Sequence, residues 1–193
     1  MIKEQNQIFH LATEHTSYVF RVTDSGHLEH LHYGRKITMP GSALFEKHAF
    51  APGNTNDIGR KEFTLEDMRL EMSSYGKGDI REPFLEVVYE DGSMTSDFRF
   101  EKAQILEGKE PYETLPGSYD ADQVEHLCIT LKEAYHNLIL ELHYYVYADC
   151  DVITRSAKLY NEGEAAVKLL RLMSLQIDFD TPDYVFTTFH GAW

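Results

Sequence analysis

Long apolar runs are absent from this sequence of 193 residues. No segment approaches the roughly 20 consecutive apolar residues that cross a bilayer as a helix. The opening residues 1–7 are polar, so no signal peptide is predicted either. We therefore expect a cytoplasmic protein without a membrane partner.

Cysteine is scarce, with only Cys128 and Cys150 in the chain. Each lies in or beside a strand-like run, and structural disulfides are rare in cytoplasmic proteins. The sequence therefore predicts two buried free thiols rather than a disulfide or a metal-binding pair.

Positive charge is also scarce, because 18 Lys and Arg face 32 Asp and Glu, for a formal net charge of −14 at pH 7. An acidic chain of this kind repels the phosphate backbone of DNA and RNA. This charge balance argues against a nucleic-acid partner.

Short motifs of common catalytic and metal sites are missing as well: the sequence has no HExxH, CxxC, GxSxG or GxxxxGKS. His30 and His32 are two apart, which places both rings on one face of a strand, and His27 is close by. Zinc, however, needs three or four converging ligands. We expect surface or interface histidines and neither a metal nor another cofactor.

The many carboxylates single out no pair with the separation that a glycosidase requires, so no catalytic residue is predicted.

Strand signals, in contrast, are abundant. The alternating run at residues 152–160 is followed by Asn161-Glu162-Gly163, and apolar residues then recur on one face of residues 167–179. This pattern predicts a long β-hairpin. Shorter alternating runs occupy residues 7–11, 17–22, 27–33, 84–89, 97–106, 127–131 and 138–147. Residues 65–72 come nearest to a helical pattern and could form one or two turns, so the sequence predicts an all-β sandwich of mostly antiparallel strands.

Two irregular segments interrupt the strands. Residues 34–67 are rich in Pro, Gly and Asn and predict a long excursion. In it, Glu46, Asp57 and Arg60 lie among amides and aromatic residues, a mixture that suits sugar hydroxyls and sugar rings, although a solvated loop with turn-forming Asn and Asp is the alternative. In residues 75–83, we expect Asp79 and Arg81 to pair with each other or a neighbour.

Eight motifs follow one another along the chain: IFHL, SYVFRV, GHLEHLHYG, AFAP followed by ND, YGKGDIREP, LPGSY, DVITRSAKLYNEG and HGAW. In this order the sequence resembles the N-terminal domain of family-36 glycoside hydrolases, the bacterial α-galactosidases. The resemblance implies a galactose mutarotase-like β-supersandwich at residues 1–193, lacking its later strands. It also implies that a (β/α)₈ catalytic barrel follows beyond residue 193.

The resemblance also implies a function. Family members remove terminal α-galactosyl residues from melibiose, raffinose and related sugars with retention, and both catalytic aspartates belong to the barrel. No carboxylate of this chain inherits either role, so residues 1–193 alone are expected to be inactive. A stand-alone carbohydrate-binding or scaffold module is the alternative.

Loops of the N-terminal domain reach a neighbouring subunit's sugar site in this family, whose members are commonly tetramers. The resemblance therefore makes Glu46 and Arg60, with Asp57 in reserve, the candidate substrate-binding residues. It implies three partners: α-galactosides, the chain's own barrel and further copies of the chain.

Overall fold

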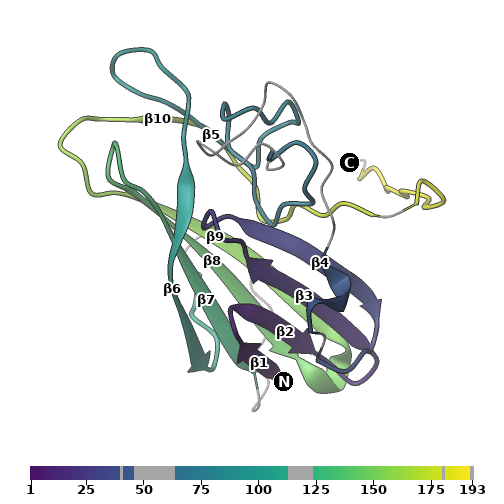
Figure 1. Cartoon of the computed structure of the whole chain (residues 1–193). Coiled ribbons are helices and arrows are strands. Elements are labelled where there is room, and N and C mark those ends of the chain that lie inside the picture. Colours follow the sequence, from purple (N-terminus) through teal and green to yellow (C-terminus); the bar gives the residue numbers. More distant parts are fainter. Residues whose placement is uncertain (40, 46–63, 113–123, 180, 192–193) are drawn as a thin grey trace.

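The computed structural model describes residues 1–39, 41–45, 64–112, 124–179 and 181–191. Two four-stranded antiparallel sheets pack face to face, and a separate strand pair lies beside them (Figure 1). The first sheet has the order β1 (Ile2–Gln5), β2 (Ile8–Ala12), β3 (Thr16–Val22) and β4 (Leu28–Arg35). The second has the order β6 (Phe98–Glu107), β7 (Glu125–Glu133), β8 (Leu138–Tyr147) and β9 (Val152–Asn161).

All regular structure in the described residues is β apart from two single 3₁₀ turns, η1 (Ser42–Leu44) and η2 (Ala148–Cys150). The alternating runs of the sequence therefore became strands, and the prediction of an antiparallel all-β fold is confirmed. Residues 65–72, in contrast, form turns and an isolated bridge, so the suggestion of helical turns there was wrong.

The core lies between the two large sheets because each strand turns alternate side chains inward. From β7 and β8 the inward residues include Leu127, Ile129, Leu131, Leu140, Leu142 and Tyr144, and from β2 and β3 they include Phe9, Leu11, Tyr18 and Phe20. The Phe20 and Tyr144 rings stack across the interface with centroids 5.2 Å apart. These contacts join the sheets into one sandwich.

The predicted hairpin of residues 152–179 was wrong. β9 pairs with β8, whereas β10 (Lys168–Leu172) leaves that sheet and pairs antiparallel with β5 (Leu85–Val88). One reason is the turn after β9, where the Glu162 backbone N–H donates to the Asn137 carbonyl at 3.1 Å and so fixes this turn against the β7–β8 turn. The other is that β5, with Leu85 and Val87 buried in the core, offers β10 a partner strand.

Several residue-level expectations also need correction. A register shift in the β3–β4 ladder separates His30 from His32, so the ring of His30 is buried against Glu71 while His32 bonds the Arg35 carbonyl. The expectation of surface or interface histidines also fails at four further positions that are buried within this chain: His10, His27, His126 and His143. Both cysteines are free as predicted, but only Cys128 is buried and Cys150 is exposed.

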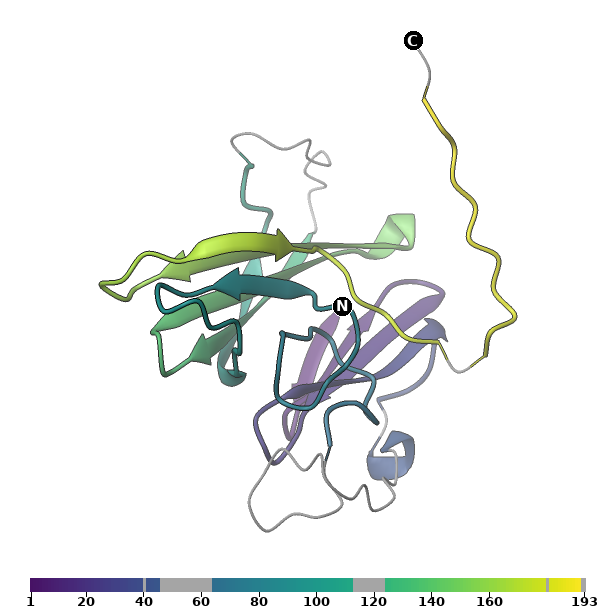
Figure 2. The ribbon, with the colours of Figure 1, turned by 90° about the horizontal axis from the view of Figure 1, so that it is seen from above.

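The C-terminal part of the described chain leaves the sandwich as an extended strand-free segment, drawn in yellow in Figure 2. Its aromatic side chains face solvent, with Phe186 91% and Phe189 94% exposed. No helix in the described ranges is long and apolar enough to cross a membrane.

Candidate functional site

The sequence-predicted substrate residues Glu46, Asp57 and Arg60 all fall within residues 46–63, outside the part of the chain that the structure describes. The structure does describe both flanks of this segment. These flanks determine where the segment leaves and rejoins the sandwich.

The flank before residue 46 is fixed to the outer face of the β1–β4 sheet. Leu44 and Phe45 pack with Ile37 and Met39 on a small buried cluster formed by Ile8, Val19 and Leu31. The Arg21 guanidinium lies 3.7 Å from the centroid of the Phe45 ring, a cation–π contact. Arg21 is itself held by Glu29, whose Oε2 accepts from Arg21 Nε at 2.5 Å. The chain therefore enters residues 46–63 from a position that these contacts define.

The flank after residue 63 is held along the edge of β4. The His30 backbone N–H donates to the Arg69 carbonyl at 2.7 Å, and the Glu71 N–H donates to the Leu28 carbonyl at 3.1 Å. Leu65, Met68 and Leu70 form a separate buried cluster just before these contacts. Residues 64–71 therefore lie on the same sheet as the opposite flank.

The Arg81 side chain joins this second flank to residues 75–83 through hydrogen bonds. We call Arg81 and the groups that it bonds the Arg81 latch. Arg81 Nη2 and Nη1 donate to the backbone carbonyls of Leu65 and Met68 at 3.0 and 2.7 Å. Two further bonds of 2.9 Å each join the guanidinium to both oxygens of Asp79, and Asp178 accepts at 2.9 Å. The predicted Asp79–Arg81 pair is confirmed. Bidentate pairs of this kind fix orientation as well as distance.

A buried polar network surrounds the Glu71 carboxylate between the two sheets. The fully buried Glu71 carboxylate accepts from the hydroxyls of Tyr18 and Tyr144, each at 2.7 Å, and from His30 Nδ1 at 2.8 Å. Arg155 of β9 lies 3.3 Å from the same carboxylate and donates to the Tyr18 hydroxyl at 2.8 Å. This network, the Glu71–Arg155 clamp, bridges β3, β4, β8 and β9.

Electrostatics explain why the clamp is structural. Burial alone would raise the pKa of Glu71, but the Arg155 charge and the His30 hydrogen bond outweigh burial and lower it, so the carboxylate stays ionised. Burial and the Glu71 charge raise the pKa of Tyr18 well above its ordinary value, and burial likewise raises that of Tyr144. A carboxylate with no exposed surface and with several donors already bound is not available to attack or protonate a substrate.

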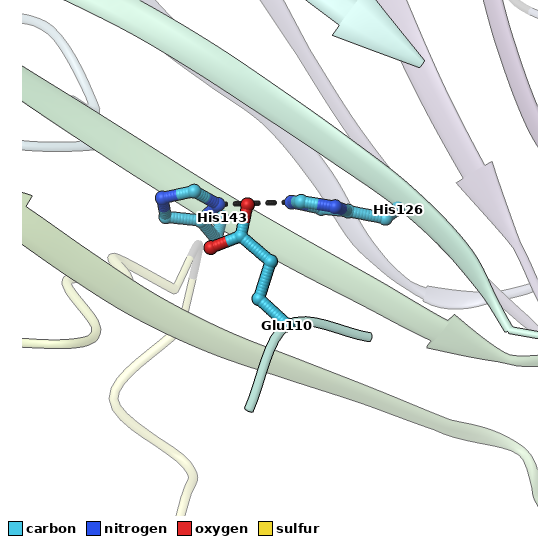
Figure 3. A group of neighbouring side chains, drawn as sticks. All are labelled: Glu110, His126 and His143. Atoms are coloured by element: carbon cyan, nitrogen blue, oxygen red, sulfur yellow. Dashed lines mark hydrogen bonds between the residues drawn. The ribbon is translucent and has the colours of Figure 1, made fainter. Parts of the chain in front are cut away.

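A second polar group occupies the opposite, outer face of the β6–β9 sheet. Glu110, His126 and His143 each turn one possible ligand atom toward the others, all within 4.8 Å (Figure 3). The two rings share a hydrogen bond of 2.9 Å between His126 Nε2 and His143 Nδ1. Burial and the neighbouring His143 lower the pKa of His126 to about 4, so its ring is neutral at pH 7. An overlapping group contains Cys128, Glu141 and His143.

Sequence reasoning missed both polar groups for different reasons. The alternation of residues 152–160 did place Arg155 on the same face as Ile153 and Ala157, so a charge on an apolar face was the signal for the clamp. The signal for the histidine pair was weaker. His126 and His143 meet only because β7 pairs with β8 in one particular register, which opposes Cys128 to His143.

Comparison with known proteins identifies the family of this chain. Residues 26–193 match the glycosyl hydrolase family 36 N-terminal domain. The alpha-galactosidase AgaA of Geobacillus stearothermophilus is 35% identical over 98% of this chain and 26% of its own length. For the alpha-galactosidase Mel36A of Lactobacillus acidophilus, the identity is 31% over 98% of this chain and 26% of that protein.

Solved structures of α-galactosidases align with this chain as well. The crystal structure of the alpha-galactosidase AgaB from Geobacillus stearothermophilus aligns with a TM-score of 0.87 at 32% identity, over 95% of this chain and 26% of that one. A structure of an AgaA variant in complex with raffinose aligns with a TM-score of 0.86 at 34% identity, over 92% and 25% of the two chains. The chain thus spans about a quarter of the length of the relatives that it matches. It belongs to the glycosyl hydrolase family 36 N-terminal domain.

Proposed function

We propose that this chain is the N-terminal, non-catalytic domain of an α-galactosidase that hydrolyses terminal α-galactosyl residues of the melibiose and raffinose class. The observation that carries the proposal is the family match over residues 26–193. Relatives of which this chain spans about a quarter are named α-galactosidases. Solved complexes of AgaA variants with raffinose and stachyose support the substrate class.

In this proposal, residues 1–193 support a (β/α)₈ barrel beyond residue 193 and lend residues 46–63 to its sugar site. Arg60 donates hydrogen bonds to sugar hydroxyls, while the carboxylates of Glu46 and Asp57 accept them. The two flanks, both packed and hydrogen-bonded to the β1–β4 sheet, support this role, because side chains that bind a ligand must be presented from a fixed scaffold. The full-length protein is proposed to be a cytoplasmic homo-oligomer, a tetramer, in which the barrel that receives this segment is that of a neighbouring subunit.

The division of labour between domain and barrel can be tested on the purified 193-residue chain. It should not hydrolyse p-nitrophenyl α-galactoside, because both catalytic aspartates belong to the proposed barrel. Turnover that a point substitution within residues 1–193 abolishes would overturn this part of the proposal. Reading the coding sequence past codon 193 is the second test: a barrel supports the proposal, whereas a stop codon supports a stand-alone carbohydrate-binding module.

The binding role is tested in the full-length protein with Arg60→Ala. We expect kcat/KM to fall about tenfold or more, which corresponds to roughly 1.4 kcal/mol of lost interaction with the sugar. Arg99→Ala is the matched control, because Arg99 is a partly exposed arginine paired with Asp97 at 3.0 Å on the sandwich. Equal effects of the two substitutions would remove Arg60 from the sugar site.

A further inference from the structure

We propose that Glu110, His126 and His143 form a binding site for one divalent transition-metal ion of the Zn²⁺ class on the outer face of the β6–β9 sheet. Two imidazole nitrogens and one carboxylate oxygen are a ligand set that suits such ions and leaves a position open to water. The proposal uses no residue of the proposed sugar-binding segment and does not depend on that role.

The three ligands come from three segments: His126 from β7, His143 from β8 and Glu110 from the connection between β6 and β7. β7 and β8 pair so that His126 opposes Tyr145 and Cys128 opposes His143, which makes the two histidines diagonal neighbours on one face. Glu110 precedes β7 in sequence and turns its carboxylate toward the gap between the rings (Figure 3). Tetrahedral zinc with Zn–N distances of about 2.0–2.1 Å would hold two nitrogens roughly 3.3 Å apart. His126 Nε2 and His143 Nδ1 are 2.9 Å apart and face each other in one hydrogen bond, so an ion that replaces the shared proton requires the two rings to separate slightly and to turn in their planes.

The surroundings hold the rings as a metal site requires. The His126 ring stacks on Tyr145 with centroids 4.4 Å apart, which restricts the tilt of the ring plane. His143 Nε2 is buried 3.3 Å from Glu141 Oε2, yet it makes no well-aligned hydrogen bond to any described residue. Metal-bound histidines usually donate their second N–H to a carboxylate. An ion on Nδ1 would place the remaining proton of His143 on Nε2, beside Glu141.

Lys158 is the competitor for this site, because its ammonium group pairs with the Glu110 carboxylate. The alternative reading is that this ion pair and the shared hydrogen bond of the histidines complete the structure without a metal. The two readings differ in a measurable way. Removing the lysine charge should strengthen metal binding in our proposal, since the carboxylate is then free to bind the ion.

The experiment is a titration of the metal-free 193-residue chain with ZnCl₂, followed by calorimetry, and with CoCl₂, followed by its visible absorption. We expect one equivalent to bind and the affinity to fall at least tenfold in Glu110→Gln and in His143→Gln. Lys158→Met should bind more tightly. His15→Gln, a change at a histidine whose side chain is 72% exposed, should bind as the unmodified chain does.

The Glu110→Gln variant and one further variant, Cys128→Ser, keep the test decisive. Glu110→Gln is expected to fold normally, because its side chain is 42% exposed, so loss of binding in this variant cannot be ascribed to unfolding. Cys128→Ser separates the overlapping group, since thiolate coordination would give Co²⁺ a near-ultraviolet charge-transfer band that this substitution removes. Such a band, no saturable binding, or equal affinity in the Glu110→Gln and His15→Gln variants would each overturn the proposal.

Discussion

At the scale of single residues, the Glu71–Arg155 clamp places one buried carboxylate and one buried guanidinium between the sheets. Such pairs contribute little net stability as a unit, but removing one partner leaves an uncompensated buried charge. Glu71→Gln should therefore lower the free energy of unfolding by about 3–5 kcal/mol in chemical denaturation. Glu107→Gln, at the exposed end of β6, should change it by less than about 0.5 kcal/mol. Similar losses in the two variants would show that removing Glu71 leaves no uncompensated buried charge on Arg155.

Asp97 gives a residue-scale prediction for pH. Burial would raise its pKa, but hydrogen bonds from His27 at 2.9 Å and Arg99 at 3.0 Å outweigh burial and hold the pKa far below its usual value. An acid whose pKa is depressed in the folded state stabilises the fold above its unfolded-state pKa, near 4, and loses this contribution as pH falls below that. Asp97→Asn should cost about 1–2 kcal/mol at pH 7, and the difference should shrink below pH 4 in urea titrations. A difference that stays constant with pH would contradict the assignment.

At the scale of elements, the Arg81 latch connects three segments that have no strand ladder in common. Arg81→Met keeps the length of the side chain but removes its bonds to Leu65, Met68, Asp79 and Asp178. We expect unfolding to become easier by about 2–3 kcal/mol and hydrogen exchange to accelerate at the Glu71 backbone N–H, which bonds the Leu28 carbonyl. Arg99→Met is the control, because among the described residues the Arg99 side chain donates hydrogen bonds only to the nearby Asp97. Unchanged exchange at Glu71 would show that the latch does not hold this flank.

The strands also show which features of the fold a local sequence pattern can predict. Period-2 alternation located the strands because inward and outward positions differ in polarity along one segment. It could not choose the partner of residues 168–172, since that choice depends on β5, a strand far away in sequence. The same limit applied to the sites. The pairing of Asp79 with Arg81 is local and was predicted, whereas the contact of His126 with His143 needs the β7–β8 register. Glu46, Asp57 and Arg60 remain predictions, because they lie outside the described residues.

At the scale of the whole molecule, exposed aromatic surface is concentrated in the segment after β10. Phe186 and Phe189 project almost fully into solvent, and exposed apolar groups of this kind favour association. β9 also has a strand partner only on its β8 side among the described strands, which leaves an edge open to pairing. We therefore expect light scattering on the sized chain to show dimers or larger species.

The double substitution Phe186→Ser and Phe189→Ser should shift this distribution toward monomer without lowering the free energy of unfolding, since neither ring packs in the core. Tyr135→Ser is the control, because this side chain is 88% exposed on the turn between β7 and β8. A sharp monomer peak for the unmodified chain would remove this expectation.

The pairing of β10 with β5 has a kinetic consequence. The β1–β4 and β6–β9 sheets are each built from strands that follow one another along the chain, so each can form through short-range contacts. The β5–β10 ladder must instead close a loop that contains the entire β6–β9 sheet, and contacts across such distances form slowly. In pulse-labelled refolding, the Met173 amide, which donates to the Phe84 carbonyl at 3.0 Å at the end of this ladder, should gain protection after the amides of β7 and β8. The segment that follows β10 would then take its place last.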